Sequence, residues 1–177
     1  MAETGDGVGA LAPGGRARGV GGRPAVAPEQ AVAPVLVSAC LAGIPCRYDG
    51  AARPDPQVVA AVEAGLAVPV CAEVLGGLPT PRPPAEIVGG DGYDVLAGRA
   101  RVLTEAGHDV TRAFVAGASA VVEQAREHRV ERAVLKAKSP SCGAGQVYDG
   151  TFNGTLTGGD GVLAAALRRA GVEVESR

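Results

Sequence analysis

Short runs of Val, Leu and Ala alternate with amphipathic segments from Val35 to the end of the chain. Such apolar runs are typical of strands buried on both faces of a parallel sheet, and we expect strands at residues 35–39, 66–70, 133–137 and 172–174. Apolar residues at helical spacing predict helices between them, at residues 56–65, 111–128 and 161–169. This alternation predicts an α/β fold with a mostly parallel open sheet and helices on both faces, a Rossmann-like three-layer arrangement.

The segment between the second strand and the long helix has a different pattern. Two alternating runs flank Ala97-Gly98, and alternation around such a dipeptide predicts a β-hairpin near residues 93–103, inserted at the rim of the sheet. Residues 80–86 contain three prolines and are expected to form a stiff loop. The one arginine of this loop, Arg82, is suited to holding a carbonyl or an anion.

Residues 1–34 consist mainly of Gly, Ala and Pro with scattered charges, without apolar periodicity and without an aromatic residue. A segment of this composition cannot bury enough apolar surface to offset the entropy lost on ordering. We therefore expect a disordered extension over residues 1–34 and one folded domain over residues 35–177.

The charge balance disfavours several classes of partner. Seventeen basic and nineteen acidic residues give a formal charge of −2, so there is no net basic character for a long nucleic acid or an anionic membrane. No apolar run approaches the roughly 18 residues of a membrane span, and the start of the chain lacks the pattern of a signal peptide. We expect a cytoplasmic protein.

Three of the four cysteines follow predicted strands. Cys40 comes directly after the first strand, Cys71 after the second, and Cys142 a few residues beyond the third. The carboxyl ends of parallel strands meet at one edge, where open α/β sheets bind their ligands, so the three thiols are expected to converge there. Burial as a small apolar residue is the ordinary alternative for any one cysteine. Three at equivalent strand ends, in turn sequences containing Gly and Pro, favour a functional site.

Three converging thiolates are suited to a metal centre with one open position. A zinc ribbon is disfavoured because no Cys-x-x-Cys pair exists, and His108 and His128 flank the long helix, away from the cysteines. Thiolates select iron–sulfur clusters or zinc, and a cluster held by three cysteines keeps one iron free for substrate. A redox pair, for example Cys40 with Cys46, is a further alternative.

The expected rim loops carry other polar and aromatic residues. Arg-Tyr-Asp-Gly at residues 47–50 is echoed by Tyr-Asp-Gly at residues 148–150, which suits either a cage for a small planar ligand or two unrelated turns. Glu73 follows Cys71 by two residues. At this edge a partly buried carboxylate can act as a general acid or base.

The motifs with this chemistry are Ser-Ala-Cys-Leu at 38–41, Arg-Tyr-Asp-Gly at 47–50, Cys-Ala-Glu-Val-Leu-Gly-Gly-Leu-Pro-Thr-Pro-Arg at 71–82, Ala-Glu-Ile at 85–87, Lys-Ser-Pro-Ser-Cys-Gly at 138–143 and Tyr-Asp-Gly-Thr-Phe at 148–152. In this order they resemble the DUF523 family, whose characterised members are 2-thiouracil desulfidases. The resemblance runs from about Val35 to the C-terminus. It departs from the family at Ala72, where Pro is frequent, and over residues 91–101, which look like an insertion.

The resemblance implies a [4Fe-4S] cluster on Cys40, Cys71 and Cys142, and it leaves Cys46 out of the site. It also implies catalytic roles for Glu73 and Ser139. The residues expected to bind substrate are Tyr48, Asp49, Arg82, Ser141 and Tyr148. In the implied hydrolysis the open iron polarises a thiocarbonyl as a Lewis acid, Glu73 assists the attack of water, and Ser139 hydrogen-bonds the ring or relays a proton. Sulfur leaves as sulfide, and no electron donor is needed.

The expected partner is a small thiolated pyrimidine or its nucleotide, with no membrane and no long nucleic acid, and a homodimer stays open. Two other functions also stay open from the residues alone. One is sulfur transfer by the same cluster, for example to a tRNA base, and the other is a metal- or sulfide-binding module without turnover.

Overall fold

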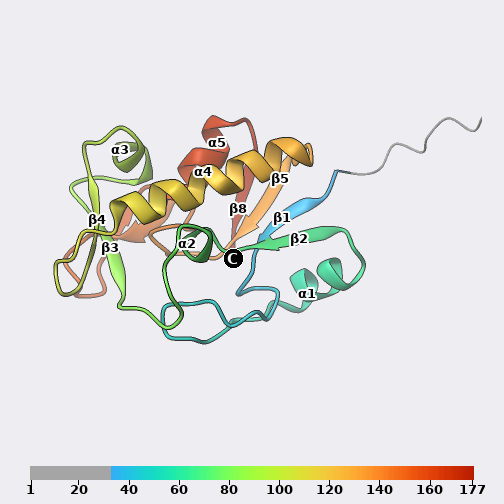
Figure 1. The fold of residues 1–177 in the computed structure, drawn as a ribbon, viewed down its shortest axis with the longest axis horizontal. Coiled ribbons are helices and arrows are strands. Elements are labelled where there is room, and N and C mark those ends of the chain that lie inside the picture. The colour runs from blue at the N-terminus through green and yellow to red at the C-terminus, as the bar shows by residue number, and fades with distance from the viewer. Residues whose placement is uncertain (1–32) are drawn as a thin grey trace, which may run out of the picture. The chain divides into compact units, whose positions relative to one another are not determined.

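Four parallel strands form the central sheet, in the order β2-β1-β5-β8. They are β1 (Val35–Ser38), β2 (Ala67–Val70), β5 (Arg132–Leu135) and β8 (Glu173–Ser176). The computed structural model describes residues 33–177 of the chain. Figure 1 shows these strands side by side, with their connections running over both faces. The predicted parallel sheet is confirmed.

Helices cover both faces of the sheet, as predicted. Successive residues of a strand point to opposite faces. Leu36 accordingly belongs to the apolar core formed with α4 (Thr111–Glu127) and α5 (Val162–Arg169), whereas Val37 belongs to a second core under α1 (Pro56–Glu63). In Figure 1, α1 lies beside β2, away from α4 and α5.

The hairpin predicted near residues 93–103 is wrong. Its first run is the short helix α3 (Gly92–Leu96), because Asp91 and Asp94 form a capping box that satisfies the backbone at its N-terminus. Its second run is β4 (Arg101–Thr104), which pairs antiparallel with β3 (Ala85–Val88). The partner of β4 is therefore β3, which lies at the end of the proline-rich segment.

Three short elements that the sequence pattern does not indicate complete the fold. They are α2 (Ala72–Leu75), β6 (Gln146–Tyr148) and β7 (Leu156–Gly158), the last two paired antiparallel. Helix α2 begins just after β2 and packs closely on α4. The two helices are so near that a Cβ atom on Gly117 of α4 would collide with the carbonyl oxygen of Ala72 in α2. Glycine at this position fixes how near α2 lies to α4.

The predicted extension over residues 1–34 falls outside the described residues, apart from its last two positions, and stays a prediction. Within residues 33–177, none of the helices combines the length and apolar character that crossing a membrane requires.

Candidate active site

The sheet order places a topological switch point at β1. The chain passes from β1 to β2 on one side, and β5 later pairs on the other side. Ligands of open α/β sheets bind outside the carboxyl ends of the strands at such a point. A cavity of about 550 Å³ lies there, and its lining includes Cys40, Cys46, Cys71 and Cys142. The structure thus brings the three predicted ligands to one cavity, together with the fourth cysteine.

The cavity walls are tied together at the strand ends. The Ser38 hydroxyl at the end of β1 accepts a hydrogen bond from the backbone N–H of Lys136, just beyond β5, at 2.9 Å. The Cys71 thiol approaches the carbonyl oxygen of Cys46 at 3.9 Å. Cys40 and Cys142 are buried and Cys71 is partly exposed. The sulfur side of the cavity is therefore well shielded from solvent.

The four thiols perturb one another. Contact with the Cys46 side chain lowers the pKa of the Cys71 thiol to about 6 and holds the pKa of Cys40 below its usual value. The same contacts raise the pKa of Cys46, with the larger effect from Cys40. Burial raises the pKa of Cys142 to about 12. The contacts with Cys46 therefore shift Cys40 and Cys71 toward the thiolate, which is the form that binds metal, and shift Cys46 toward the thiol.

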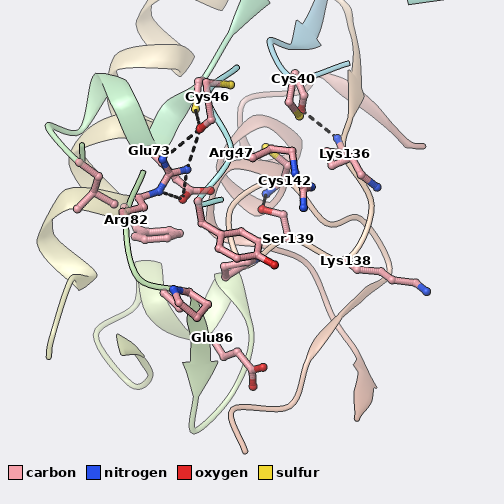
Figure 2. Close-up of a pocket in the computed structure, with 18 of the residues that line it drawn as sticks. Cys40, Cys46, Arg47, Glu73, Arg82, Glu86, Lys136, Lys138, Ser139 and Cys142 are labelled. Atoms are coloured by element: carbon pink, nitrogen blue, oxygen red, sulfur yellow. Dashed lines mark hydrogen bonds and ion pairs between the residues drawn. The ribbon is translucent and has the colours of Figure 1, made fainter. Parts of the chain in front are cut away.

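Glu73 lies in α2 and is held by Arg82. The guanidinium donates from Nε to Glu73 Oε2 at 2.8 Å, and its terminal Nη2 lies 2.7 Å from the same oxygen. Arg82 also donates to the carbonyl of Cys46 from both terminal nitrogens at 3.1 Å. Figure 2 shows Arg82 between Glu73 and Cys46. Burial raises the pKa of Glu73, and the neighbouring Arg82 opposes that effect.

Ser139 closes the turn that carries Cys142. Its hydroxyl oxygen accepts from the backbone N–H groups of Ser141 and Cys142, each at 3.1 Å. The preceding residue, Lys138, has φ of 64°, a conformation uncommon for a residue with a side chain and often found at functional sites. This turn places the side chains of Ser139 and Cys142 in the lining of the cavity.

Comparison with known proteins shows the family to which the chain belongs. A family model described as 2-thiouracil desulfurase matches residues 35–177. The chain belongs to this family. It is 46% identical over 142 residues to the Bacillus subtilis (strain 168) protein YbbK, covering 80% of this chain and 94% of that relative. A solved structure, described as the [4Fe-4S]-dependent thiouracil desulfidase TudS, matches with a TM-score of 0.72 and 42% identity over 81% of this chain and 90% of that chain.

The remaining residues predicted to bind substrate separate into two groups. Tyr48 and Tyr148 line the cavity of this desulfurase family member. Asp49 is outside the lining and accepts from the backbone N–H of Ala51 at 3.0 Å, so it shapes its turn. Ser141 is also outside the lining, buried, with its carbonyl accepting from the N–H of Leu163 in α5 at 2.8 Å.

Several cavity residues were not predicted from the sequence. Arg47, Lys136 and Lys138 bring positive charge to the lining. Lys136 and Lys138 could have been found from the sequence, because Lys136 lies near the end of the third predicted strand and Lys138 directly follows it. Glu86 in β3 lies at the end of the cavity away from the cysteines in Figure 2. Its Oε2 atom accepts from the backbone N–H groups of Gly150 and Phe152 at 3.0 Å, which anchors the loop following Tyr148.

The donor set fits an iron–sulfur cluster. Every cysteine is free, all four line the cavity, and the positive charge of Arg47 adds to the lowering of the Cys40 pKa. Such soft thiolate donors favour iron–sulfur clusters or zinc over oxygen-binding cations. Within the described part of the chain, no three His, Cys, Asp or Glu side chains are grouped so that they could bind a single metal ion.

Proposed function

We propose that this protein is a [4Fe-4S]-dependent desulfidase that removes sulfur by hydrolysis from a thiolated pyrimidine such as 2-thiouracil. Family membership over residues 35–177 and the likeness to TudS support the activity and the cofactor. The observation that carries the proposal is a single cavity lined by three cysteines that follow the strands of the sheet, a largely buried carboxylate and a serine hydroxyl.

Cys40 and Cys71 at the ends of β1 and β2, and Cys142 in the turn that follows β5, would hold the cluster. When bound by three cysteines, a [4Fe-4S] cluster supplies one iron without a protein ligand, a Lewis acid for the soft sulfur of a thiocarbonyl group. Cys46 lines the same cavity, but in our proposal it is not a cluster ligand. Its thiol is instead hydrogen-bonded to the sulfurs of Cys40 and Cys71.

Glu73 is the proposed general base. Its carboxylate is largely shielded from solvent and lines the cavity, and both contacts from Arg82 go to Oε2. A carboxylate so placed takes a proton from the water that attacks the thiocarbonyl carbon and returns it toward the departing sulfur. The net reaction converts a carbon–sulfur double bond and water into a carbon–oxygen double bond and hydrogen sulfide.

Ser139 is the proposed hydrogen-bond donor to the heterocycle. Its oxygen already accepts two backbone hydrogen bonds, so the hydroxyl hydrogen is available to a ring nitrogen or oxygen. Tyr48 and Tyr148 offer flat aromatic surfaces for a planar base in the same lining. These groups orient the ring so that its thiocarbonyl meets the cysteine side of the cavity.

The proposed substrate is a small molecule, either the free base or its nucleotide. A cavity of about 550 Å³ is within the range of small-molecule sites. The cytoplasmic location and a homodimer stay as predictions.

The test is anaerobic purification, cluster reconstitution and incubation with 2-thiouracil in the absence of a reductant. We expect sulfide and uracil to appear in equal amounts, in proportion to the bound iron. Protein that carries a full cluster but releases no sulfide from any thiolated base, nucleoside or nucleotide would refute the proposal.

A further inference from the structure

Arg82 has no hydrogen-bond donor left for a substrate. A guanidinium carries five N–H groups. Nε–H donates to Glu73, Nη1 to the carbonyl oxygens of Cys46 and Pro79 at 3.1 Å each and to the Thr80 hydroxyl at 3.3 Å, and Nη2 to Cys46 at 3.1 Å. Nη2 also lies 2.7 Å from Glu73 Oε2. Each nitrogen is therefore engaged by groups of the protein itself.

The position of Arg82 is itself fixed. Only 6% of its side chain is exposed, and its backbone N–H donates to the carbonyl of Tyr48 at 2.9 Å. It therefore connects α2, which carries Glu73, to the loop around Cys46 that follows Cys40. These two segments are continuous with two of the proposed cluster ligands, Cys71 and Cys40.

Glu73 is held through only one oxygen. Both close contacts from Arg82 go to Oε2, and no residue among 33–177 donates a hydrogen bond to Oε1. One oxygen is thus fixed by the protein while the other is available for water or substrate in the cavity that Glu73 lines.

We infer that Arg82 is a positioning residue that holds the Glu73 carboxylate by Oε2 against the Cys46 loop and leaves Oε1 to act on water. The inference rests on the proposed function for the role of Glu73. It replaces the expectation that Arg82 binds substrate, because a guanidinium saturated by the protein adds no contact to a ligand.

The kinetic test compares Arg82→Gln and Arg82→Lys with wild type, with each rate expressed per bound cluster. For Arg82→Gln we expect kcat to fall about 10- to 100-fold while KM stays within about threefold. In Arg82→Lys kcat should fall less, because the lysine ammonium can bond to either Glu73 or the Cys46 carbonyl. It lacks the forked guanidinium that bonds to both at once. The control is Arg126→Gln, which breaks an exposed Arg–Glu pair on α4 and should leave both parameters unchanged.

A second readout does not depend on turnover. If Arg82 acts through Glu73, the Tm losses of Glu73→Gln and Arg82→Gln are not additive in the double variant. The kcat of the double variant should also equal that of Glu73→Gln alone wherever residual turnover is measurable. Because wild type reports the desulfidase activity separately, failure of the proposed function is distinguishable from failure of this inference.

Three results would overturn the inference. One is a raised KM with unchanged kcat, which would make Arg82 a substrate contact. Another is a loss of activity that disappears when rates are normalised to iron, which would make Arg82 a purely structural residue. The third is additive Tm losses in the double variant, which would show that Arg82 and Glu73 are not coupled.

Discussion

The Ser139 hydroxyl oxygen accepts a hydrogen bond from the backbone nitrogen of Cys142 at 3.1 Å. A second bond, from the Ser141 nitrogen at 3.1 Å, completes a turn in which one side chain supports the backbone of a proposed cluster ligand. Lys138, just before this turn, adopts a left-handed backbone conformation. The proposed chemical role of Ser139 is therefore combined with a structural one.

Ser139→Ala should show both roles. Loss of the acceptor should lower Tm by a few degrees and reduce the iron bound per chain, and loss of the hydroxyl hydrogen should lower kcat more than 10-fold per bound cluster. Ser139→Thr keeps the oxygen and should keep the iron content. Iron analysis and sulfide release measure these effects. Wild-type kcat per cluster in Ser139→Ala would disprove the chemical role.

The cysteines offer a matched set of variants, because all four line one cavity. Serine at Cys40, Cys71 or Cys142 removes a proposed ligand and should abolish iron and acid-labile sulfide after reconstitution. Cys46→Ser should retain both, because serine can still donate a hydrogen bond to its neighbours. If Cys46→Ser lost iron as completely as the other three, the ligand assignment would be wrong.

Gly117→Ala should destabilise the protein, although replacing glycine by alanine within a helix normally stabilises it. Alanine in the middle of a helix normally stabilises it by about 1 kcal/mol relative to glycine. At this position the new Cβ would collide with the carbonyl of Ala72 and displace α2, which carries Glu73. We expect a lower Tm and a lower kcat, whereas Gly158→Ala, where no atom lies within 4 Å of the new Cβ, should change neither. A Gly117→Ala protein as stable as wild type would contradict the described packing of α2 on α4.

Asp55→Ala should cost stability without affecting catalysis. Asp55 caps α1 by accepting from the N–H groups of Gln57 at 2.9 Å and Val58 at 3.2 Å, and loss of a cap of this kind should lower Tm by about 2–4 °C. The bond from Val58, foremost, holds the pKa of Asp55 below its ordinary value of 3.8. Because the pKa of Asp55 is lower in the folded state than in the unfolded state, the ionised cap stabilises the fold near neutral pH. This stabilisation is lost as the pH falls through the folded-state pKa.

Thermal unfolding at several pH values tests the assignment of this cap. The Tm difference between wild type and Asp55→Ala should shrink toward pH 3. A difference that is constant from pH 7 to pH 3 would contradict it.

The sheet and its cysteines could be predicted because their signals are local. The run Val35 to Val37 is apolar at successive positions, so both faces of its strand are apolar, and Cys40 and Cys71 follow their strands within two residues. Parallel topology then brings distant strand ends together without any knowledge of side-chain contacts.

The parts that could not be predicted depend on contacts between distant segments. The run after Asp91 alternates like a strand but forms α3 because of its capping box, and β4 pairs with a strand that the prolines obscured. Arg82 could be recognised as an anion-binding residue, but its spacing does not reveal that the anion is Glu73, nine positions earlier. Asp49 lies in a motif of the family yet faces its own turn.

The central claim is hydrolysis of a carbon–sulfur bond at a cluster in the cavity of Cys40, Cys71 and Cys142. The most direct measurement is turnover of 2-thiouracil by the reconstituted protein in oxygen-18-labelled water without a reductant, with mass analysis of the uracil formed. The account predicts uracil that carries one labelled oxygen, one sulfide per uracil, and neither product from Glu73→Gln with its cluster intact. Sulfide release that requires a reductant, or uracil without the label, would contradict it.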